Sequence, residues 1–422
     1  MKISVVIPTR SRAEYLRETL RTVAEAARLC PLPVEVVVSD NASDDDTPQV
    51  CAEAGIPGLT CVRQPARLSM RQNFEAALAA STGSHVLFIG DDDAVAPHGL
   101  LRLSEMIASG AHEIFKWRVV NYIWPDPGRG RPGSVILRTN KLSGRVRRIA
   151  PQALLADFAN GRMGTYQSGA MIYHGCISRS LIDRVRAAQG GTYFWTTCPD
   201  VYASVANLLH ARGDLLAADI PVTIGGASPR SNGTAGKEYT QTAKTPETSE
   251  YARFLAELKG DPCLGRTPAT CPSINLVTID ALQLAHQMAA RPLALDVPAW
   301  VGRLSAEFAG LAPAVAAEAR DQARVLIGAA ADTIALPAAA PAPPAPTAAD
   351  APALTVSLAK VRITGGAAMS GILPAARLID RICGAETAFG DLPRNAAGML
   401  WRMGALLARA RAASRHEGRM EL

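Results

Sequence analysis

Three consecutive aspartates, Asp91, Asp92 and Asp93, follow the apolar run His85–Ile89 and Gly90. Like charges at this spacing repel one another, so a core strand that ends in them needs a cation or water to relieve the repulsion. Hard oxygen ligands suit Mg²⁺ or Mn²⁺, and these ions usually bring a phosphate group with them. The triplet therefore predicts a divalent-metal site, and it favours a nucleotide-dependent transferase.

Two further polar clusters also follow apolar runs, at Pro8–Arg12 and Ser39–Thr47. Ligands of open α/β sheets bind at the carboxyl ends of the strands, where all three clusters would meet. Asp40 lies at the very end of its run, which favours a binding role. Asp44–Asp46 are better explained as acidic residues that complement the dipole of the next helix.

The elements that must position these residues alternate between strands and helices. Near-continuous apolar strands are typical of a parallel sheet that is buried on both faces. Ser69–Gln72 has the pattern of a capping box at the start of a helix. The alternation predicts an α/β fold with a doubly wound, mostly parallel sheet. The predicted strands are Ile3–Ile7, Val34–Val38, Leu59–Arg63, His85–Ile89 and Glu113–Val120.

The rest of the chain divides by composition. Residues 126–150 contain Pro, Gly and six Arg, which predicts an exposed loop or a hairpin insertion. An Ala/Pro tract later in the chain is typical of a linker. The predicted units are a domain over 1–235 (halves 1–125 and 126–235), a helical extension over 236–335, a linker over 336–354 and a helical basic tail over 355–422.

The bulk composition excludes some classes of function. A net charge of +6 is too small to indicate nucleic-acid binding, and an aromatic share of 5% offers no evident base-stacking platform. The eight cysteines contain no Cys-x-x-Cys pair and fit the reduced core cysteines of a cytosolic protein. No run approaches the ~20 apolar residues of a membrane-spanning helix. We therefore expect a cytoplasmic protein.

Three blocks of the sequence together resemble glycosyltransferase family 2. The blocks are ISVVIPTR at 3–10, VVVSDNASDD at 36–45, and Asn73 followed by ASTGSHVLFIGDDD at 80–93. The resemblance covers residues 1–235. It implies a GT-A fold, a nucleotide-diphosphate sugar as donor (UDP by default), a divalent metal and inversion at the anomeric carbon. It also implies a setting in bacterial surface polysaccharide or glycan synthesis, with a glycan or a lipid-linked acceptor.

The resemblance implies roles for single residues. Thr9 and Arg10 match positions that line the nucleotide, and Asp40 matches the aspartate that accepts a hydrogen bond from the base. Arg71 and Asn73 fall on the helix near the donor, where packing and capping are equally good explanations. The predicted donor-binding set is Pro8, Thr9, Arg10, Arg12, Asp40, Asn41, Arg71, Asn73, Asp91 and Arg230.

The Asp-x-Asp metal motif of the family matches the triplet imperfectly. Aligned on Pro97, the usual first aspartate is replaced by Gly90, and Asp92 becomes the metal-binding residue. A shift by one residue gives Asp91 and Asp93 instead. Both alignments stay open, with Asp92 ranked first for binding Mg²⁺ or Mn²⁺.

An inverting transfer also needs a carboxylate base for the acceptor hydroxyl. Asp200 opens a predicted helix and resembles the acidic residue at this place in the family. An N-cap aspartate that stabilises the helix by about 1 kcal/mol is the structural alternative. Asp183 and Asp157 are lesser candidates.

Other side chains have both a functional and a structural explanation. Arg230 could close over the diphosphate or be an ordinary surface arginine. His174 could contact substrate or form structural hydrogen bonds, and Trp195 could stack on a sugar or belong to the core. The helix predicted at Leu400–Arg415 suits a membrane surface, but a packing or homo-oligomer helix explains it better.

Two rival functions remain at this level. A nucleotidyltransferase would need a glycine-rich phosphate loop after the first strand, and Pro8–Arg12 contains no glycine. A nucleotide-sugar or carbohydrate-binding protein without catalysis is the second rival. The intact triplet and Asp200 argue against it.

Overall fold

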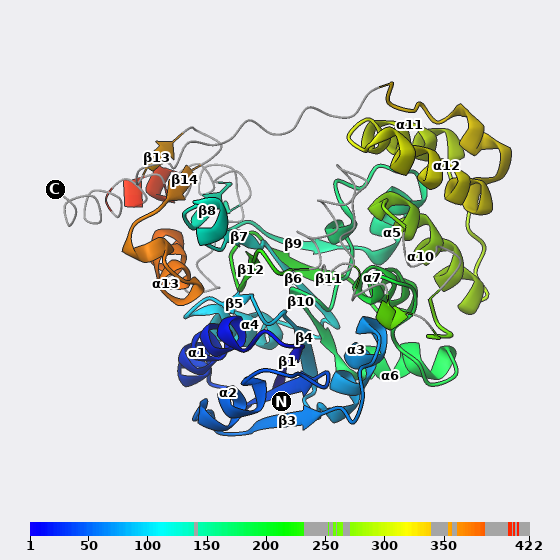
Figure 1. Cartoon of the computed structure of the whole chain (residues 1–422). Coiled ribbons are helices and arrows are strands. Elements are labelled where there is room, and N and C mark those ends of the chain that lie inside the picture. The colour runs from blue at the N-terminus through cyan, green and yellow to red at the C-terminus, as the bar shows by residue number, and fades with distance from the viewer. Residues whose placement is uncertain are drawn as a thin grey trace.

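The computed structural model describes most of the chain in one body of sheets and helices (Figure 1). The described residues are 1–138, 142–231, 271–338 and 361–384, with shorter stretches at 252, 256–258, 260–264, 353–356, 404–406, 408–409 and 412.

The first sheet has eight strands among these residues, in the order β3-β2-β1-β4-β10-β6-β11-β9. Strands β3, β2, β1 and β4 are parallel neighbours, as are β6 and β11. Only β10 and β9 oppose the rest, so the predicted mostly parallel sheet is confirmed. The bounds are β1 Ile3–Thr9, β2 Val34–Asp40, β3 Leu59–Arg63, β4 His85–Phe88, β6 Ile114–Trp117, β9 Val146–Ile149, β10 Gly175–Ser178 and β11 Leu215–Ala218.

Helices cover both faces of this sheet because successive strand residues point to opposite sides. Val5 and Ile7 of β1 pack with α1, α2 and α4, whereas Val6 packs on the face of α3, α6 and α7. The capping box predicted at Ser69–Gln72 starts α3. The bounds are α1 Ala13–Leu29, α2 Thr47–Glu53, α3 Met70–Ala80, α4 Gly99–Ala108, α5 Pro151–Ala159, α6 Arg179–Ala188 and α7 Pro199–His210.

A second sheet crosses the carboxyl edge of the first, in the order β13-β14-β8-β7-β12-β5. The strand predicted at Glu113–Val120 is wrong as one element. The chain leaves the first sheet after β6, where the Arg118 N–H bonds to Ile220 O, and enters the second sheet at β7. The bounds are β5 Ala94–Val95, β7 Val120–Ile123, β8 Ser134–Leu137, β12 Thr223–Ala227, β13 Ala353–Val356 and β14 Val361–Thr364.

The helical tail predicted from residue 355 is wrong for its first part. The segments 353–356 and 361–364 form a β-hairpin, and β14 pairs with β8. An unpaired strand edge offers free N–H and C=O groups, and β14 satisfies those of β8. The helix α13, Ile372–Cys383, then follows as predicted.

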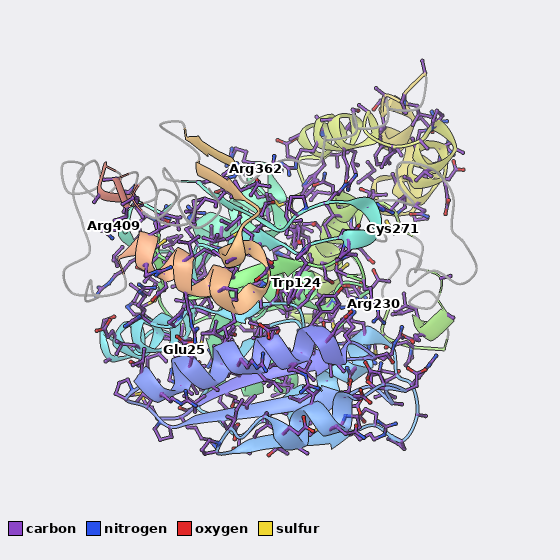
Figure 2. The ribbon with its side chains drawn as sticks, turned by 60° about the vertical axis from the view of Figure 1, so that its left-hand side comes forward. Glu25, Trp124, Arg230, Cys271, Arg362 and Arg409 are labelled. Carbon is purple, nitrogen blue, oxygen red and sulfur yellow. The ribbon has the colours of Figure 1, made fainter. Side chains whose placement is uncertain are left out.

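α13 packs along α1 and against β5, and it belongs to the same body (Figure 2). Asp380 of α13 is buried and pairs with Arg102 at 2.9 Å and with His98 at 2.6 Å. Arg377 pairs with Glu25 of α1 at 2.9 Å. Tyr122 of β7 donates to Met369 O at 2.8 Å. The segment from Met369 to Asp380 is therefore tied to β7 of the second sheet and to helices that cover the first sheet.

The described part of the predicted helical extension is helical and packs on α7 and α5 through one apolar core. Of the predicted linker, 339–352 lies outside the described residues, as does most of Leu400–Arg415. None of the described helices combines the length and apolar content needed to cross a membrane. The remaining bounds are α10 Ile274–Met288, α11 Val297–Phe308, α12 Pro313–Ile327, and the 3-10 helices η1 Pro127–Arg129, η3 Tyr166–Ser168, η4 Gly328–Thr333 and η5 Ala367–Met369.

Candidate functional site

An open pocket of about 1350 Å³ lies where the carboxyl ends of β1 and β4 meet the second sheet and the start of α7. It brings together predicted residues from all three polar clusters and from α7. Asp40, Arg71 and Arg230 do not line it. The predicted residues that line it are Pro8, Thr9, Arg10, Arg12, Asn41, Asn73, Asp91, Asp92, Asp93 and Asp200.

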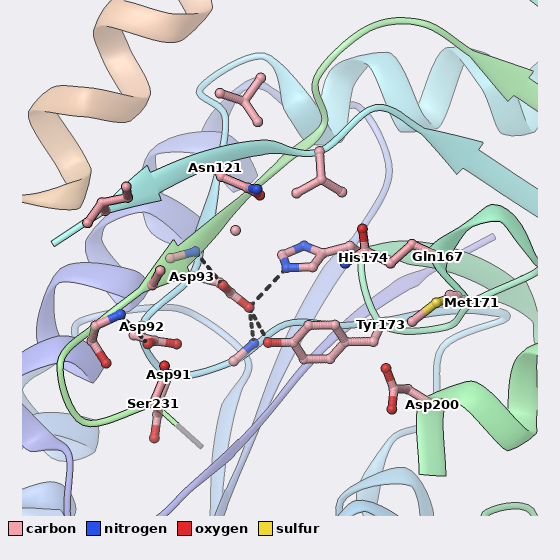
Figure 3. A pocket seen from close by; sticks show the side chains of 18 of the residues that line it. Asp91, Asp92, Asp93, Asn121, Gln167, Met171, Tyr173, His174, Asp200 and Ser231 are labelled. Carbon is pink, nitrogen blue, oxygen red and sulfur yellow. Dashed lines mark hydrogen bonds and ion pairs between the residues drawn. The ribbon is translucent and has the colours of Figure 1, made fainter. Parts of the chain in front are cut away.

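Asp93 is a hydrogen-bonded anchor between three segments (Figure 3). Its Oδ1 accepts from Gly226 N–H at 2.7 Å, and its Oδ2 accepts from Gly90 N–H and from the Tyr173 hydroxyl, both at 2.5 Å. His174 Nε2 lies 3.2 Å from the same oxygen. Burial disfavours its charge, but His174 and these hydrogen bonds outweigh burial and lower the pKa of Asp93. Its oxygens are thus engaged by protein groups.

Asp91 is held by the first strand and the loop that follows it. Thr9 Oγ1 donates to Asp91 Oδ2 at 2.7 Å, and Arg12 Nη1 lies 3.1 Å from Asp91 Oδ1. The charge of Asp91 is thus partly balanced by a guanidinium. Because β1 and β4 are parallel neighbours, these residues from distant parts of the sequence meet at one edge.

Asp92 carries the least compensated charge of the triplet. Its Oδ2 accepts from Ser228 N–H at 3.2 Å. Burial, and then the neighbouring charges of Asp93 and Asp91, raise its pKa to about 7. A divalent cation beside Asp92 would relieve this repulsion. Within the described part of the chain no three His, Cys, Asp or Glu side chains converge on one point, yet Mg²⁺ commonly takes only one or two carboxylates. The residues therefore fit such an ion, with Asp92 and Asp91 better disposed than Asp93.

Gly226 lets the second sheet approach the triplet. A Cβ built on Gly226 would lie 1.7 Å from Asp92 O and 2.9 Å from Trp124 Nε1. Trp124 Nε1 also donates to Asp92 O at 2.9 Å. A larger residue at 226 would therefore push β12 away from the aspartates.

Asp40 and Asn41 organise the loop after β2. Asp40 is fully buried and accepts from Ser43 N–H at 2.9 Å and from Arg63 at 2.7 Å. Asn41 exchanges two hydrogen bonds with the backbone of Leu68, at 2.9 and 2.8 Å. The base-binding role of Asp40 stays a prediction, because both of its oxygens already have protein partners.

Arg71 and Arg230 also have protein partners. Arg71 is buried and pairs with Asp261 at 2.8 Å. Arg230 donates to Ser11 O at 2.6 Å, and its own carbonyl accepts from Arg12. Arg230 thus ties the 228–231 loop to the loop after β1, but its side chain does not line the pocket.

Asp200 lies at the start of α7, across Tyr173 from the triplet (Figure 3). Burial raises its pKa to about 6, although its own N–H, the Val201 N–H and His174 act in the opposite direction. A carboxylate with a pKa near the working pH is suited to general base catalysis. The helix start explains the modest size of this shift, because backbone N–H groups favour the charged form.

The pocket residues outside the predicted binding and catalytic sets include Tyr173, His174, Glu257 and Lys116. Tyr173 and His174 both contact Asp93. His174 Nδ1 also lies 2.8 Å from Thr223 Oγ1, so His174 makes the structural hydrogen bonds that were one of its two predicted roles. Glu257 pairs with Arg10. Lys116 donates to Gln167 O at 2.6 Å and to Gly169 O at 2.8 Å. Their partners lie far along the chain, so no local pattern could reveal them.

Trp195 packs against the core around α3 and α7 and does not line the pocket. Of the two predicted roles, the position in the core is therefore the one that fits Trp195.

The amino-terminal part of the chain is similar to known proteins. Residues 4–171 match the family model described as glycosyl transferase family 2. Abequosyltransferase RfbV of Salmonella typhimurium is 32% identical over 115 residues, which cover 26% of this chain and 34% of the relative. An uncharacterized glycosyltransferase, alr2836, of Nostoc sp. is 30% identical over 108 residues, which cover 25% of this chain and 33% of the relative. The matches thus span about a third of the length of these relatives.

Two solved structures are similar over most of the chain. Residues 1–349 of S. aureus TarS, in complex with UDP, are 16% identical with a TM-score of 0.43, covering 79% of this chain and 91% of that one. Mannosyltransferase PcManGT from Pyrobaculum calidifontis, in complex with GDP-Man and Mn²⁺, is 18% identical with a TM-score of 0.36, covering 78% and 85%.

Proposed function

Because residues 4–171 match the model of glycosyl transferase family 2, we propose that this protein is an inverting glycosyltransferase. It moves a sugar from a nucleotide-diphosphate sugar to an acceptor hydroxyl. The observation that carries the proposal is a single pocket holding an under-compensated carboxylate, Asp92, and a second carboxylate, Asp200, on opposite sides of Tyr173.

The donor occupies the aspartate end of the pocket, which we define as Asp91–Asp93 with Thr9 and Arg12. Arg10 and Arg12 offer guanidinium groups that match phosphate oxygens. Asn73 and Asn41 extend this end toward α3 and the loop after β2. UDP is the family default for the nucleotide.

Asp92, with Asp91 beside it, would hold a Mg²⁺ or Mn²⁺ ion. When bound, such an ion supplies positive charge that neutralises the charge growing on the leaving diphosphate. Asp93 keeps the turn in place through its hydrogen bonds to Gly226, Gly90 and Tyr173. This division gives the neighbouring aspartates different tasks.

Asp200 acts as the base. Its carboxylate takes the proton from the acceptor hydroxyl while the acceptor oxygen bonds to the anomeric carbon. The bond from that carbon to the diphosphate oxygen breaks, and the nucleotide diphosphate leaves with the bonding electrons. Attack from the face opposite the leaving group inverts the anomeric centre. A pKa of about 6 leaves Asp200 ionised at neutral pH.

The setting of the reaction is proposed from the family alone. It is bacterial surface polysaccharide or glycan assembly at the cytoplasmic side, with a glycan or a lipid-linked acceptor.

A thermal-shift screen of nucleotide-diphosphate sugars with and without Mn²⁺ tests the donor side. A ligand that binds the folded state raises the melting temperature by mass action. We expect stabilisation by one donor plus Mn²⁺, and its loss in Asp92→Asn. Asp183→Asn, an exposed carboxylate on α6, is the matched control. Stabilisation of Asp92→Asn equal to the wild type would contradict the metal assignment. Donor binding by the wild type without turnover, whatever the acceptor, would favour a binding protein.

A further inference from the structure

One wall of the pocket is strongly basic and has no part in the donor chemistry. It is formed by β6, the β7–β8 hairpin and the residue after β8. Ile123 and Ile136 of the hairpin provide apolar contacts between the charges. We name this surface the arginine wall, and its cations are Lys116, Arg118, Arg129, Arg131 and Arg138.

Acidic residues balance only part of this charge. Arg118 pairs with Asp219 at 2.7 Å, and Asp219 also forms an ion pair with Arg147 at 2.9 Å. Arg129 lies 3.7 Å from Asp126. Across the described residues, no carboxylate pairs with Arg131 or Arg138, both of which are exposed. The wall therefore presents net positive charge to the pocket.

Lys116 is affected by both burial and the neighbouring positive charges. Burial, followed by the charges of Arg118 and Arg147, lowers the pKa of Lys116 to about 7. An anion bound along the wall would reverse the effect of these neighbours and favour the charged ammonium group.

The wall is separate from the donor end. The cations nearest the triplet are Arg12, which pairs with Asp91, and Arg10, which pairs with Glu257. The wall is built instead by residues between 116 and 138, and Asp200 lines the same pocket. Clefts lined by one sign of charge concentrate ligands of the opposite sign.

We propose that the arginine wall binds the acceptor, and that the acceptor is an anionic glycan carrying phosphate or carboxylate groups. This inference rests on the proposed function for its reaction, and it adds the chemical class of the second substrate. Guanidinium groups bind both anions through paired N–H donors. Several arginines along one hairpin suit a chain with repeated charges better than a single ion.

Calorimetry with three polymers tests the proposal: neutral dextran, phosphorylated dextran and carboxymethyl dextran. The wild-type protein should bind one or both anionic polymers and not the neutral one, and the preferred polymer identifies the anionic group. Binding should weaken as salt is raised, because exposed charges are screened. Equal binding of neutral and anionic dextran would overturn the proposal.

The variant Arg131→Gln/Arg138→Gln locates the binding. We expect its affinity for the anionic polymer to fall about tenfold, with an unchanged melting temperature. Arg28→Gln/Arg291→Gln removes two exposed arginines outside the pocket and should bind like the wild type. An equal loss in both double variants would indicate nonspecific attraction and would overturn the wall as the site.

The donor screen separates this proposal from the proposed function. If Arg131→Gln/Arg138→Gln keeps the stabilisation by donor and Mn²⁺ but loses the anionic polymer, both proposals stand. If the wild type binds the anionic polymer but never binds a nucleotide-diphosphate sugar, the wall stands and the proposed function fails.

Discussion

The two ends of the pocket use charge in opposite ways. At the aspartate end, three carboxylates are at most 5% exposed, and Asp93 alone accepts from Gly226, Gly90 and Tyr173. At the arginine wall, Arg131 and Arg138 are exposed. Buried charge must be matched by protein partners, whereas exposed charge is solvated by water. The aspartate end is therefore built into the fold, and the wall can vary without unfolding it.

This difference has a consequence for substrate choice. The proposed donor end is made of groups that also hold the ends of β4, β10 and β12 together. The proposed acceptor surface uses the exposed side chains of Arg131 and Arg138, whereas Tyr122, Val135 and Leu137 of the same hairpin are buried in the core. A family with one reaction and many acceptors is expected to change in the second region first.

Asp200→Asn is expected to have the largest effect, because it removes the proposed base and leaves the proposed donor site intact. Loss of a positioned base typically lowers the rate of turnover by about 10²–10⁴-fold. Steady-state transfer measures the rate, and the donor-induced thermal shift should stay at the wild-type value. A transfer rate within a factor of two of the wild type would show that Asp200 is not the base.

Asp93→Ala should unfold the aspartate end. It leaves His174 and several donors without their buried acceptor, and removing one partner of a buried charged pair costs about 3–5 kcal/mol. Urea denaturation measures the loss of unfolding free energy. Asp91→Ala should cost less, because among the described residues the Asp91 carboxylate contacts only Thr9 and an Arg12 side chain that is 15% exposed, against 8% for His174. If the two variants are equally stable, Asp93 is not the anchor described above.

The pH dependence of stability tests Asp92. Its pKa is raised to about 7 in the folded state, so the folded protein holds a proton that the unfolded chain releases near pH 4. The free energy of unfolding without metal should therefore fall as pH rises from about 4 to 7, by at most ~1.4 kcal/mol per unit.

Asp92→Asn should remove this contribution, and saturating Mn²⁺ should reverse the slope by binding the ionised form. Denaturant titrations at a series of pH values measure both effects. A pH profile of Asp92→Asn identical to that of the wild type would show that Asp92 is not the titrating group.

Arg131→Gln/Arg138→Gln should have the smallest effect on stability. Substitutions of exposed residues usually change the free energy of unfolding by less than about 0.5 kcal/mol. Urea denaturation should separate this variant from Asp93→Ala by several kcal/mol. A loss close to that of Asp93→Ala would mean that the wall, too, belongs to the core.

Much of the first sheet could be predicted from the sequence. The apolar runs of β1, β2 and β4 and the capping box at Ser69 are local patterns, and each favours one structure. The same holds for the triplet, because three carboxylates after a buried strand are a local signal.

The different roles of Asp93, which anchors the turn, and of Asp91 and Asp92, which face the proposed metal, could not be predicted from the sequence. These roles depend on Gly226, Tyr173 and His174, which lie 80 or more residues from Asp93. Arg71 shows the same limit, because its partner Asp261 is 190 residues away. The hairpin at 353–364 was missed because four-residue strands give weak periodicity and the free edge of β8 is a tertiary feature.

The pairing of β14 with β8 also affects the order in which the two sheets can form while the chain is synthesised. All strands of the first sheet precede residue 219, so the donor half can fold while the rest of the chain is still on the ribosome. The hairpin that carries the arginines gains its neighbour only after residue 364 has emerged. A nascent chain would thus form the first sheet before the edge of β8 in the second sheet gains its partner.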